Sequence, residues 1–390
     1  MTGSPRSIDW LRTLISFDTT SRDSNLPLIR HVEEELRALG LTPLIFPNGD
    51  GNKANLFVTI PAADGSRDGG VMLSGHTDVV PVDGQAWFSD PFTAEVRDGR
   101  LYGRGASDMK AFGAAALALL PEFLDRTLRV PLHLALTCDE EVGCLGAVTL
   151  LDGITAHGIT PEICFVGEPT SMRVIAAHKS SNLFRLSVTG VATHSSLTPS
   201  GVNAIEYAAR AITFIRSLAD EHRSNGPFNH DFDVPFTTAS VGLVSGGVAV
   251  NTVPDRCDVD FEFRTIPEDD PYEFLRRIRG FVQDVLLPEM RAENPDAAIE
   301  LREVAMVPGL SDAGGRKALD LAQQLTSSAT ADKVAYATEA GIYQGAGIDT
   351  VICGPGSLAQ AHTADEYIEL EQIQACEQFI LALATHLETA

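Results

Sequence analysis

Residues 71–81, VMLSGHTDVVP, place a short apolar run directly before a histidine and an aspartate. The apolar run, 71–73, is typical of a buried strand, and His76 and Asp78 follow where that strand should end. Alternate side chains of an extended segment share a face, so His76 and Asp78 can be neighbours. Taken alone, His76 is more often a hydrogen-bonded histidine at a strand end than a functional residue, and the rest of the chain has to decide between these interpretations.

Similar apolar runs recur along the first part of the chain and alternate with helical patterns. The strand candidates are 55–60, 71–75, 132–138 and 163–168. A helix within 26–39 ends at Gly40, and the Ala/Leu-rich segment 111–124 reads as a buried helix. This alternation predicts an α/β fold in which a mixed, mostly parallel sheet carries helices on both faces.

The pattern changes after about residue 179. Strand and helix candidates follow in the order β-α-β-β-α-β, at 182–190, 201–218, 237–246, 257–265, 270–287 and 297–304. This order is that of the ferredoxin-like arrangement. A chain of 390 residues also favours two domains. We therefore predict a catalytic domain in two parts, 1–178 and 306–390, with an inserted lid or dimerisation domain at 179–305.

Composition limits the possible partners. Lys and Arg number 29 against 53 Asp and Glu, a formal charge of −24, which argues against nucleic acid or an anionic membrane as partner. The N-terminal segment has a helical apolar repeat instead of the basic and apolar regions of a secretory signal. Six scattered cysteines without a CxxC pair predict free, buried thiols. We expect a cytoplasmic protein that acts on a small molecule.

Acidic and histidine residues gather where the predicted strands and loops end. They are His76 with Asp78, Asp108, the pair Glu140 and Glu141, Glu168, and His362. Each has an ordinary structural interpretation, such as a helix cap, a turn residue or a solvated corner. Their repeated occurrence at strand ends, where open α/β sheets place their sites, argues against that interpretation for the set. Imidazole and carboxylate are the ligands that zinc and related divalent ions prefer.

Five sequence motifs occur together in this chain. They are GHTDVVP at 75–81, WFSDPF at 87–92, DGRLYGRGASDMK at 98–110, DEEVG at 139–143 and VGEPTS at 166–171. In the order of these motifs and in the position of the inserted domain, the chain resembles the dizinc metallopeptidase and deacylase superfamily. That superfamily includes aminoacylases and succinyl-diaminopimelate desuccinylases. A series of motifs is more specific than any one of them.

The resemblance implies a pair of metal ions bridged by Asp108. His76 and Glu168 would bind one ion, and Glu141 and His362 the other. The ions would be zinc, with cobalt or manganese also compatible with this ligand set. The peptide bond after the bridging aspartate is expected to be cis.

Two further roles follow from the resemblance. Asp78 would accept a hydrogen bond from the free ring nitrogen of His76 and fix its tautomer. Glu140 would act as the general base that takes a proton from water and delivers it to the leaving amine.

Finer features resemble the acetylornithine deacetylases within that superfamily. They are RVIAAHKSS at 173–181, GVATHSS at 190–196, YATEAGIYQ at 336–344 and GPGSLAQAHTADEYIE at 354–369, with local departures at Ala111, Ser180 and Thr193. The resemblance implies hydrolysis of N2-acetyl-L-ornithine to L-ornithine and acetate, in arginine biosynthesis. The alternatives are another N-acyl-amino-acid deacylase, the desuccinylase, or an inactive binding protein. The complete ligand set argues against the last of these.

Four residues are candidates for substrate contacts by the same analogy. His194 would cross the interface of a homodimer and stabilise the oxyanion, and Asn251 is another candidate to contact the oxyanion or the substrate carboxylate. Arg264 could bind the substrate carboxylate, and Glu339 the amino group of ornithine. For His194, Asn251 and Arg264 the ordinary interpretations are a loop histidine, a turn asparagine and a strand-end ion pair.

Overall fold

The computed structural model describes residues 4–389, which form two compact units. Residues 178–309 and 334–337 form unit 2, and the remainder of the described chain forms unit 1. The inserted domain was predicted at 179–305, so its limits differ from those of unit 2 by one residue at the start and four at the end. Unit 1 is therefore built from three segments of the chain.

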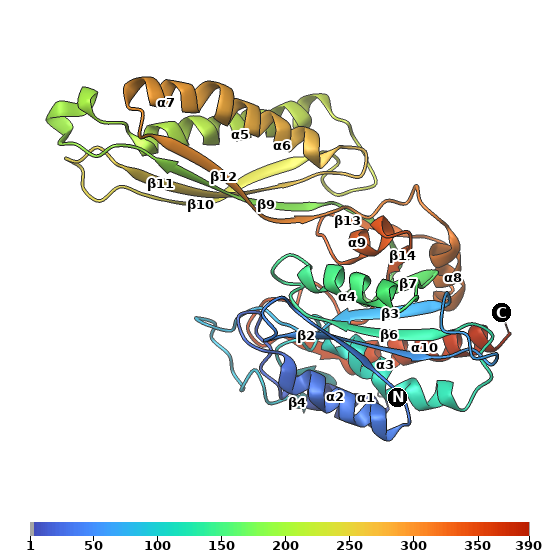
Figure 1. Ribbon diagram of the computed structural model, residues 1–390. Helices are drawn as coiled ribbons and strands as arrows, with labels where there is room; N and C mark the ends of the chain where they lie inside the picture. The colour runs from blue at the N-terminus through green and yellow to red at the C-terminus, as the bar shows by residue number, and fades with distance from the viewer. Residues whose placement is uncertain (1–3, 390) are drawn as a thin grey trace. The chain divides into compact units, whose positions relative to one another are not determined.

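An eight-stranded sheet forms the centre of unit 1 (Figure 1). Its strands, in spatial order, are β1 (Leu44–Pro47), β2 (Ala54–Ile60), β6 (Leu132–Thr137), β3 (Val71–His76), β7 (Ile163–Val166), β14 (Asp349–Ile352), β8 (Ile175–His178) and β13 (Asp332–Val334). The central strands β6, β3, β7 and β14 are mutually parallel, whereas β2 runs antiparallel to both β1 and β6, and β8 runs antiparallel to β14. The predicted mixed α/β sheet is confirmed.

Helices cover both faces of this sheet. One face packs against α1 (Pro5–Ile15), α2 (Leu26–Ala38), α3 (Lys110–Leu124), α8 (Lys317–Thr326) and α10 (Leu370–Thr389). The other carries α4 (Leu145–Ala156) and α9 (Ala340–Gly345). Helix α3 is buried on nearly all sides because α1, α10 and the sheet surround it, which explains its Ala/Leu-rich sequence.

A small antiparallel sheet lies beside the helical layer of unit 1. It contains β4 (Glu95–Arg97), β5 (Arg100–Tyr102) and β15 (Tyr367–Glu369), in the order β15-β5-β4. Tyr367 pairs with Tyr102, so the residues next to this pair, Glu366 and Gly103, also come together. The main-chain amide of Gly103 donates to the carbonyl of Glu366 at 2.9 Å. This sheet joins two segments that are distant in the sequence.

Unit 2 has the ferredoxin-like arrangement (Figure 1). Its elements are β9 (Ser181–Thr189), η1 (Ser195–Ser200), α5 (Ala204–Asn225), β10 (Thr238–Gly246), β11 (Arg256–Arg264), α6 (Pro271–Gly280), the π-helical segment η2 (Phe281–Leu286), α7 (Leu287–Glu293) and β12 (Ala298–Val307). The antiparallel sheet has the order β10-β11-β9-β12 and buries one face against the helices. The strict alternation of buried and exposed residues in β9 follows from this one-sided burial.

No helix within residues 4–389 is long and apolar enough to cross a membrane. All six cysteines are buried and free of disulfide bonds. The buried free thiols are those that the sequence predicted.

His133 on β6 is a buried, fully hydrogen-bonded imidazole. Its Nε2 donates to the carbonyl of Gly69 at 2.9 Å, and its Nδ1 therefore accepts from the hydroxyl of Thr59 at 2.9 Å. The ring also stacks on Phe57, with the ring centroids 5.2 Å apart. Burial lowers the pKa of His133 to about 4. The neutral imidazole is thus the form that the fold accommodates.

This environment predicts a specific sensitivity of folding to acid. The unfolded chain binds the proton near pH 6.5 and the folded chain only near pH 4, so the stabilisation is complete above pH 6.5 and is lost as the pH falls toward 4. Between pH 7.5 and 5.0, the wild type should lose about 2 kcal/mol more unfolding free energy than His133→Gln. Urea unfolding at the two pH values measures this difference. The exposed-site control His157→Gln should behave like the wild type, and equal losses in all three proteins would contradict the prediction.

Candidate metal centre

The candidate site lies at the carboxyl edge of the parallel strands of unit 1. His76 is the last residue of β3 and pairs with Thr137 at the end of β6. Ser74 on β3 pairs with Val166 on β7, so Glu168, two residues further on, comes level with His76. Because parallel strands end at the same edge of a sheet, side chains from several connections meet there.

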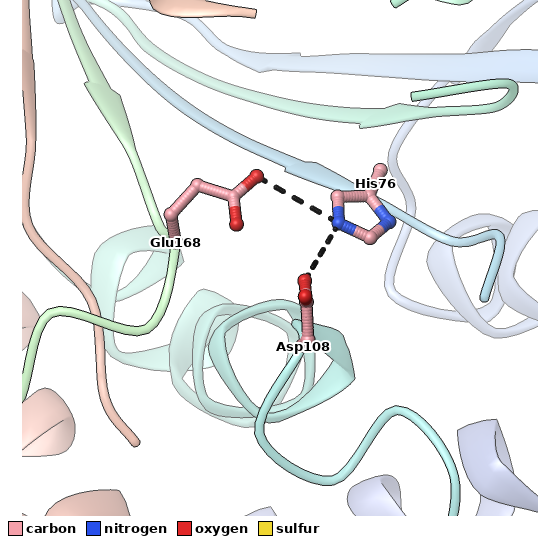
Figure 2. A group of neighbouring side chains, drawn as sticks. All are labelled: His76, Asp108 and Glu168. Atoms are coloured by element: carbon pink, nitrogen blue, oxygen red, sulfur yellow. Dashed lines mark hydrogen bonds and ion pairs between the residues drawn. The ribbon is translucent and has the colours of Figure 1, made fainter. Parts of the chain in front are cut away.

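The first group of possible ligands contains His76, Asp108 and Glu168 (Figure 2). Nε2 of His76 lies 3.1 Å from Oδ1 of Asp108 and 3.7 Å from Oε1 of Glu168. All three side chains are buried, and Figure 2 shows them converging from a strand end, a loop and the start of a helix. The peptide bond between Asp108 and Met109 is cis, as the resemblance implied.

The second group shares Asp108 with the first and adds Glu141 and His362. Nε2 of His362 lies 3.2 Å from Oδ2 of Asp108 and 3.2 Å from Oε2 of Glu141. Asp108 thus directs one carboxylate oxygen toward each histidine, which is the arrangement a bridging ligand requires. The structure brings together all five residues that were predicted to bind metal, in the two predicted sets.

Electrostatics explains why this cluster suits cations. Burial, with the neighbouring carboxylates, raises the pKa of Glu168 and of Glu140 well above the usual range for glutamate. Within residues 4–389, Oε1 of Glu168 is buried without a hydrogen-bond partner. A buried carboxylate oxygen without a partner is costly, and a divalent ion between these groups would remove that cost. The nitrogen and oxygen donors therefore fit divalent metal ions of the zinc type.

Asp108 differs from the other carboxylates in this site. Burial opposes its ionisation, but hydrogen bonds with His362 and His76 outweigh burial and lower its pKa. The same contacts raise the pKa of His362 to about 10, with the hydrogen bonds to Asp108 and Glu141 as the main causes. Asp108 and His362 thus each shift the pKa of the other toward its charged form.

Asp78 has a different role from the predicted one. Nδ1 of His76 donates to the main-chain oxygen of Asp78 at 2.9 Å, while the nearer carboxylate oxygen lies 3.7 Å away. The chain turns after β3, and this turn brings the carbonyl of Asp78 to the ring. Its carboxylate accepts instead from the main-chain amides of Glu140, at 3.1 Å, and Glu141, at 3.3 Å. The hydroxyl of Ser21 donates to it at 2.7 Å, so Asp78 fixes the turn that carries both glutamates.

The turn at residues 138–144 places Glu140 beside the metal ligands. Asp139, with φ of 58°, forms a buried ion pair with Lys53. The thiol of Cys144 donates to Oε1 of Glu140 at 3.4 Å, and the main-chain amide of Cys144 donates to the carbonyl of Glu140 at 2.9 Å. Lys53 and Ser21 carried no motif in the sequence, so their contribution was not predicted.

Three of the four candidate substrate contacts lie in unit 2 and one lies in unit 1. Asn251 and His194 lie together in unit 2, where the carbonyl of Asn251 accepts from the amide of Ser195 at 3.0 Å and His194 is exposed. Arg264, also in unit 2, pairs with Glu262 at 3.0 Å. These residues remain candidates for substrate binding.

Glu339 lies in unit 1 and is enclosed. Only 1% of its surface is exposed, and Oε2 accepts from the hydroxyls of Tyr343, at 3.2 Å, and Ser74, at 3.3 Å. Its contact with a substrate amino group stays a prediction. Glu339 packs behind strand β3, because α9 begins there and buries its first turn against the sheet.

The sequence of this chain matches a known protein family and a protein of named activity. Residues 72–386 match the profile of "Peptidase family M20/M25/M40". An acetylornithine deacetylase of Pasteurella multocida (strain Pm70) is 33% identical over 374 residues, covering 95% of this chain and 94% of that protein.

Solved structures show the same fold. A tripeptidase of Staphylococcus aureus superposes with a TM-score of 0.76 at 19% identity, with both chains fully covered. A dinuclear metal-binding peptidase of the M20 family from Bacillus subtilis has a TM-score of 0.66 at 16% identity, covering 99% of this chain and 98% of that one.

The two ligand groups predict the metal content of the protein. The wild type should retain about two divalent ions per chain, and His76→Ala or His362→Ala about one, since each histidine belongs to a single group. Elemental analysis after dialysis against zinc or cobalt measures this content. The exposed-site variant His157→Ala should keep the wild-type content. One ion in the wild type, or two in both site variants, would show that the groups are not two metal sites.

Proposed function

Because the chain belongs to the peptidase family M20/M25/M40 and is a metal-dependent amidohydrolase, we propose that it hydrolyses N2-acetyl-L-ornithine to L-ornithine and acetate. The observation that carries the chemistry is the pair of ligand groups sharing Asp108, with Glu140 next to the ligand Glu141. The relative named for this reaction supports the substrate, since it matches nearly the whole chain. The formal charge of −24 also favours a substrate with a cationic side chain over a dianionic one.

The proposed reaction gives each residue of the site a task. Bound divalent ions, zinc first among them, supply a Lewis acid that polarises an amide carbonyl and eases the ionisation of water. His76, Asp108 and Glu168 would hold one ion, and Asp108, Glu141 and His362 the other.

Glu140 would act as the base in this reaction. It takes the proton of the attacking water and gives it to the leaving amine nitrogen, which leaves the carboxylate as it began. Burial raises the pKa of Glu140, and a more basic carboxylate accepts this proton more readily. Two hydrogen bonds keep Glu140 in place, one from the Cys144 thiol to its carboxylate and one from its main-chain amide to the carboxylate of Asp78.

The setting of the reaction is also part of the proposal. It would be the ornithine-forming step of arginine biosynthesis, in the cytoplasm, carried out by a homodimer that pairs through unit 2. Edge strand β10 supports such pairing, because Leu243 and Val244 are 67% and 55% exposed there. His194 would then reach the partner's site and stabilise the oxyanion. Light scattering that finds one chain per particle would exclude this part of the proposal.

Substrate preference tests the assignment. Among acetylornithine, succinyl-diaminopimelate and acetylmethionine, we expect acetylornithine to give the highest kcat/KM, by at least about tenfold, a margin equivalent to about 1.4 kcal/mol in the transition state. The assay uses the metal-loaded wild type and one metal for all three substrates. If acetylornithine ranks last while another substrate is hydrolysed, the chain is a deacylase of a different N-acyl amino acid.

Replacement of the proposed base tests the mechanism. Glu140→Gln keeps the size of the side chain but cannot accept the proton, so kcat should fall by about 10²–10⁴-fold. The metal content should stay at the wild-type value, because Glu140 belongs to neither ligand group. The exposed-site control Glu122→Gln should retain full activity. A Glu140→Gln enzyme with normal metal content and wild-type kcat would remove Glu140 from the role of base.

A further inference from the structure

The carboxylate of Glu366 is buried and fully occupied by donors. Oε1 accepts from the main-chain amides of Ser107, at 2.8 Å, and Asp108, at 3.0 Å. Oε2 accepts from the amide of Gly105 at 3.0 Å and from Nη1 of Arg104 at 2.7 Å. The side chains of Arg104 and Glu366 are each 1% exposed. Glu366 therefore holds the whole loop that ends at the shared ligand Asp108.

Arg104, the partner of Glu366 in this ion pair, is connected by hydrogen bonds to the loop that contains the ligand His362. Its Nη1 donates to the carbonyl of Thr363 at 3.3 Å, and its Nη2 donates to Oε1 of Gln85 at 2.6 Å. Nε2 of Gln85 donates in turn to the carbonyl of His362 at 2.9 Å. Trp87 completes the arrangement, with its Nε1 donating to Gln85 at 3.0 Å. Two consecutive residues, His362 and Thr363, are thus held by hydrogen bonds that lead back to Glu366.

The two ligand groups depend on this network to different degrees. His76 is the last residue of strand β3, and Glu168 lies two residues after the end of strand β7. Asp108 and His362 lie in loops, and His362 has a φ of 60°, in the left-handed region that non-glycine residues rarely adopt. The second group therefore takes two of its three members from segments that the Arg104–Glu366 network holds.

Stability alone is a weak reason for burying this ion pair. The cost of removing both charges from water commonly equals or exceeds their attraction, so apolar residues of similar volume can be as stable. Apolar residues could not accept hydrogen bonds from the three main-chain amides that Glu366 binds. They also could not donate the hydrogen bond by which Arg104 orients Gln85. The buried pair is thus better suited to fixing the positions of the loops around it than to stabilising the fold.

We infer that Arg104 and Glu366 are positioning residues that set Asp108 and His362 for the second metal site, the one formed with Glu141. The pair belongs to neither ligand group, and it acts through the main chain of the two loop ligands. This inference rests on the proposed metal site, but it is independent of which amide the enzyme hydrolyses.

The variant Glu366→Gln tests the inference with little change in volume. Its single carbonyl oxygen cannot serve four donors, and its NH2 group would face main-chain amides that are themselves donors. We expect affinity for the second ion to fall by about 10–100-fold, and affinity for the first ion, which shares only Asp108 with this network, to fall less. Calorimetric titration of the metal-free protein with zinc or cobalt gives both dissociation constants. In the His362→Ala background, where only the first group is complete, Glu366→Gln should change the remaining constant much less.

A matched control separates positioning from general loss of a buried carboxylate. Glu377 is 7% exposed and accepts from the amide of Ser4 at 2.9 Å, outside both ligand groups. Glu377→Gln should leave both metal constants unchanged. Folded Glu366→Gln protein with both constants at the wild-type values would overturn the inference. A wild type that binds two ions but does not hydrolyse acetylornithine would refute the proposed substrate and leave this inference standing.

A milder variant keeps the test decisive if Glu366→Gln does not fold. Gln85→Ala removes the hydrogen bond to the His362 carbonyl together with those from Arg104 and Trp87, and it leaves the ion pair between Arg104 and Glu366 in place. Weaker binding of the second ion alone, with unchanged thermal unfolding of the metal-free protein, supports the inference. Unchanged binding of both ions in this variant would overturn it.

Discussion

The shared carboxylate of Asp108 is the constraint on which the site depends. One of its oxygens lies 3.1 Å from His76 and the other 3.2 Å from His362, so a shift of this residue disturbs both groups at once. Asp108 stands in a loop, where the chain itself restricts position least. Its position is therefore determined by its neighbours. These are the start of α3, which follows it in the chain, and the carboxylate of Glu366, which accepts a hydrogen bond from its main-chain amide.

A second requirement is to keep several carboxylates close together in a buried place. The fold meets it at the carboxyl edge of β3, β6 and β7, where register brings His76 and Glu168 to one level and the turn after β6 carries Glu140. Burial and mutual repulsion raise the pKa of Glu140 and Glu168, so the metal-free site is costly to ionise. Divalent ions relieve this cost, and their binding free energy thereby contributes to the stability of unit 1.

Much of this could be predicted from the sequence, because the ligands follow apolar strands and lie in recognisable motifs. The role of Asp78 could not, since the turn after β3 decides whether its carbonyl or its carboxylate meets His76. Lys53 and Glu366 were missed for another reason. Their partners lie 86 and 258 residues away in the sequence, and no local periodicity indicates such contacts. The enclosure of Glu339 likewise depends on how α9 packs against the sheet.

The two ligand groups are supported by different kinds of structure, and this has a consequence for metal binding. Glu168 and His76 stand on or next to central strands, whose ladder hydrogen bonds fix them before any ion arrives. His362 comes from a loop with a half-exposed side chain, so its position relies on tertiary hydrogen bonds that open more easily. Ordering a ligand on binding costs free energy that a preformed ligand does not require. The first group is thus the stronger site on structural grounds, and the second is the one whose occupancy the surrounding loops can regulate.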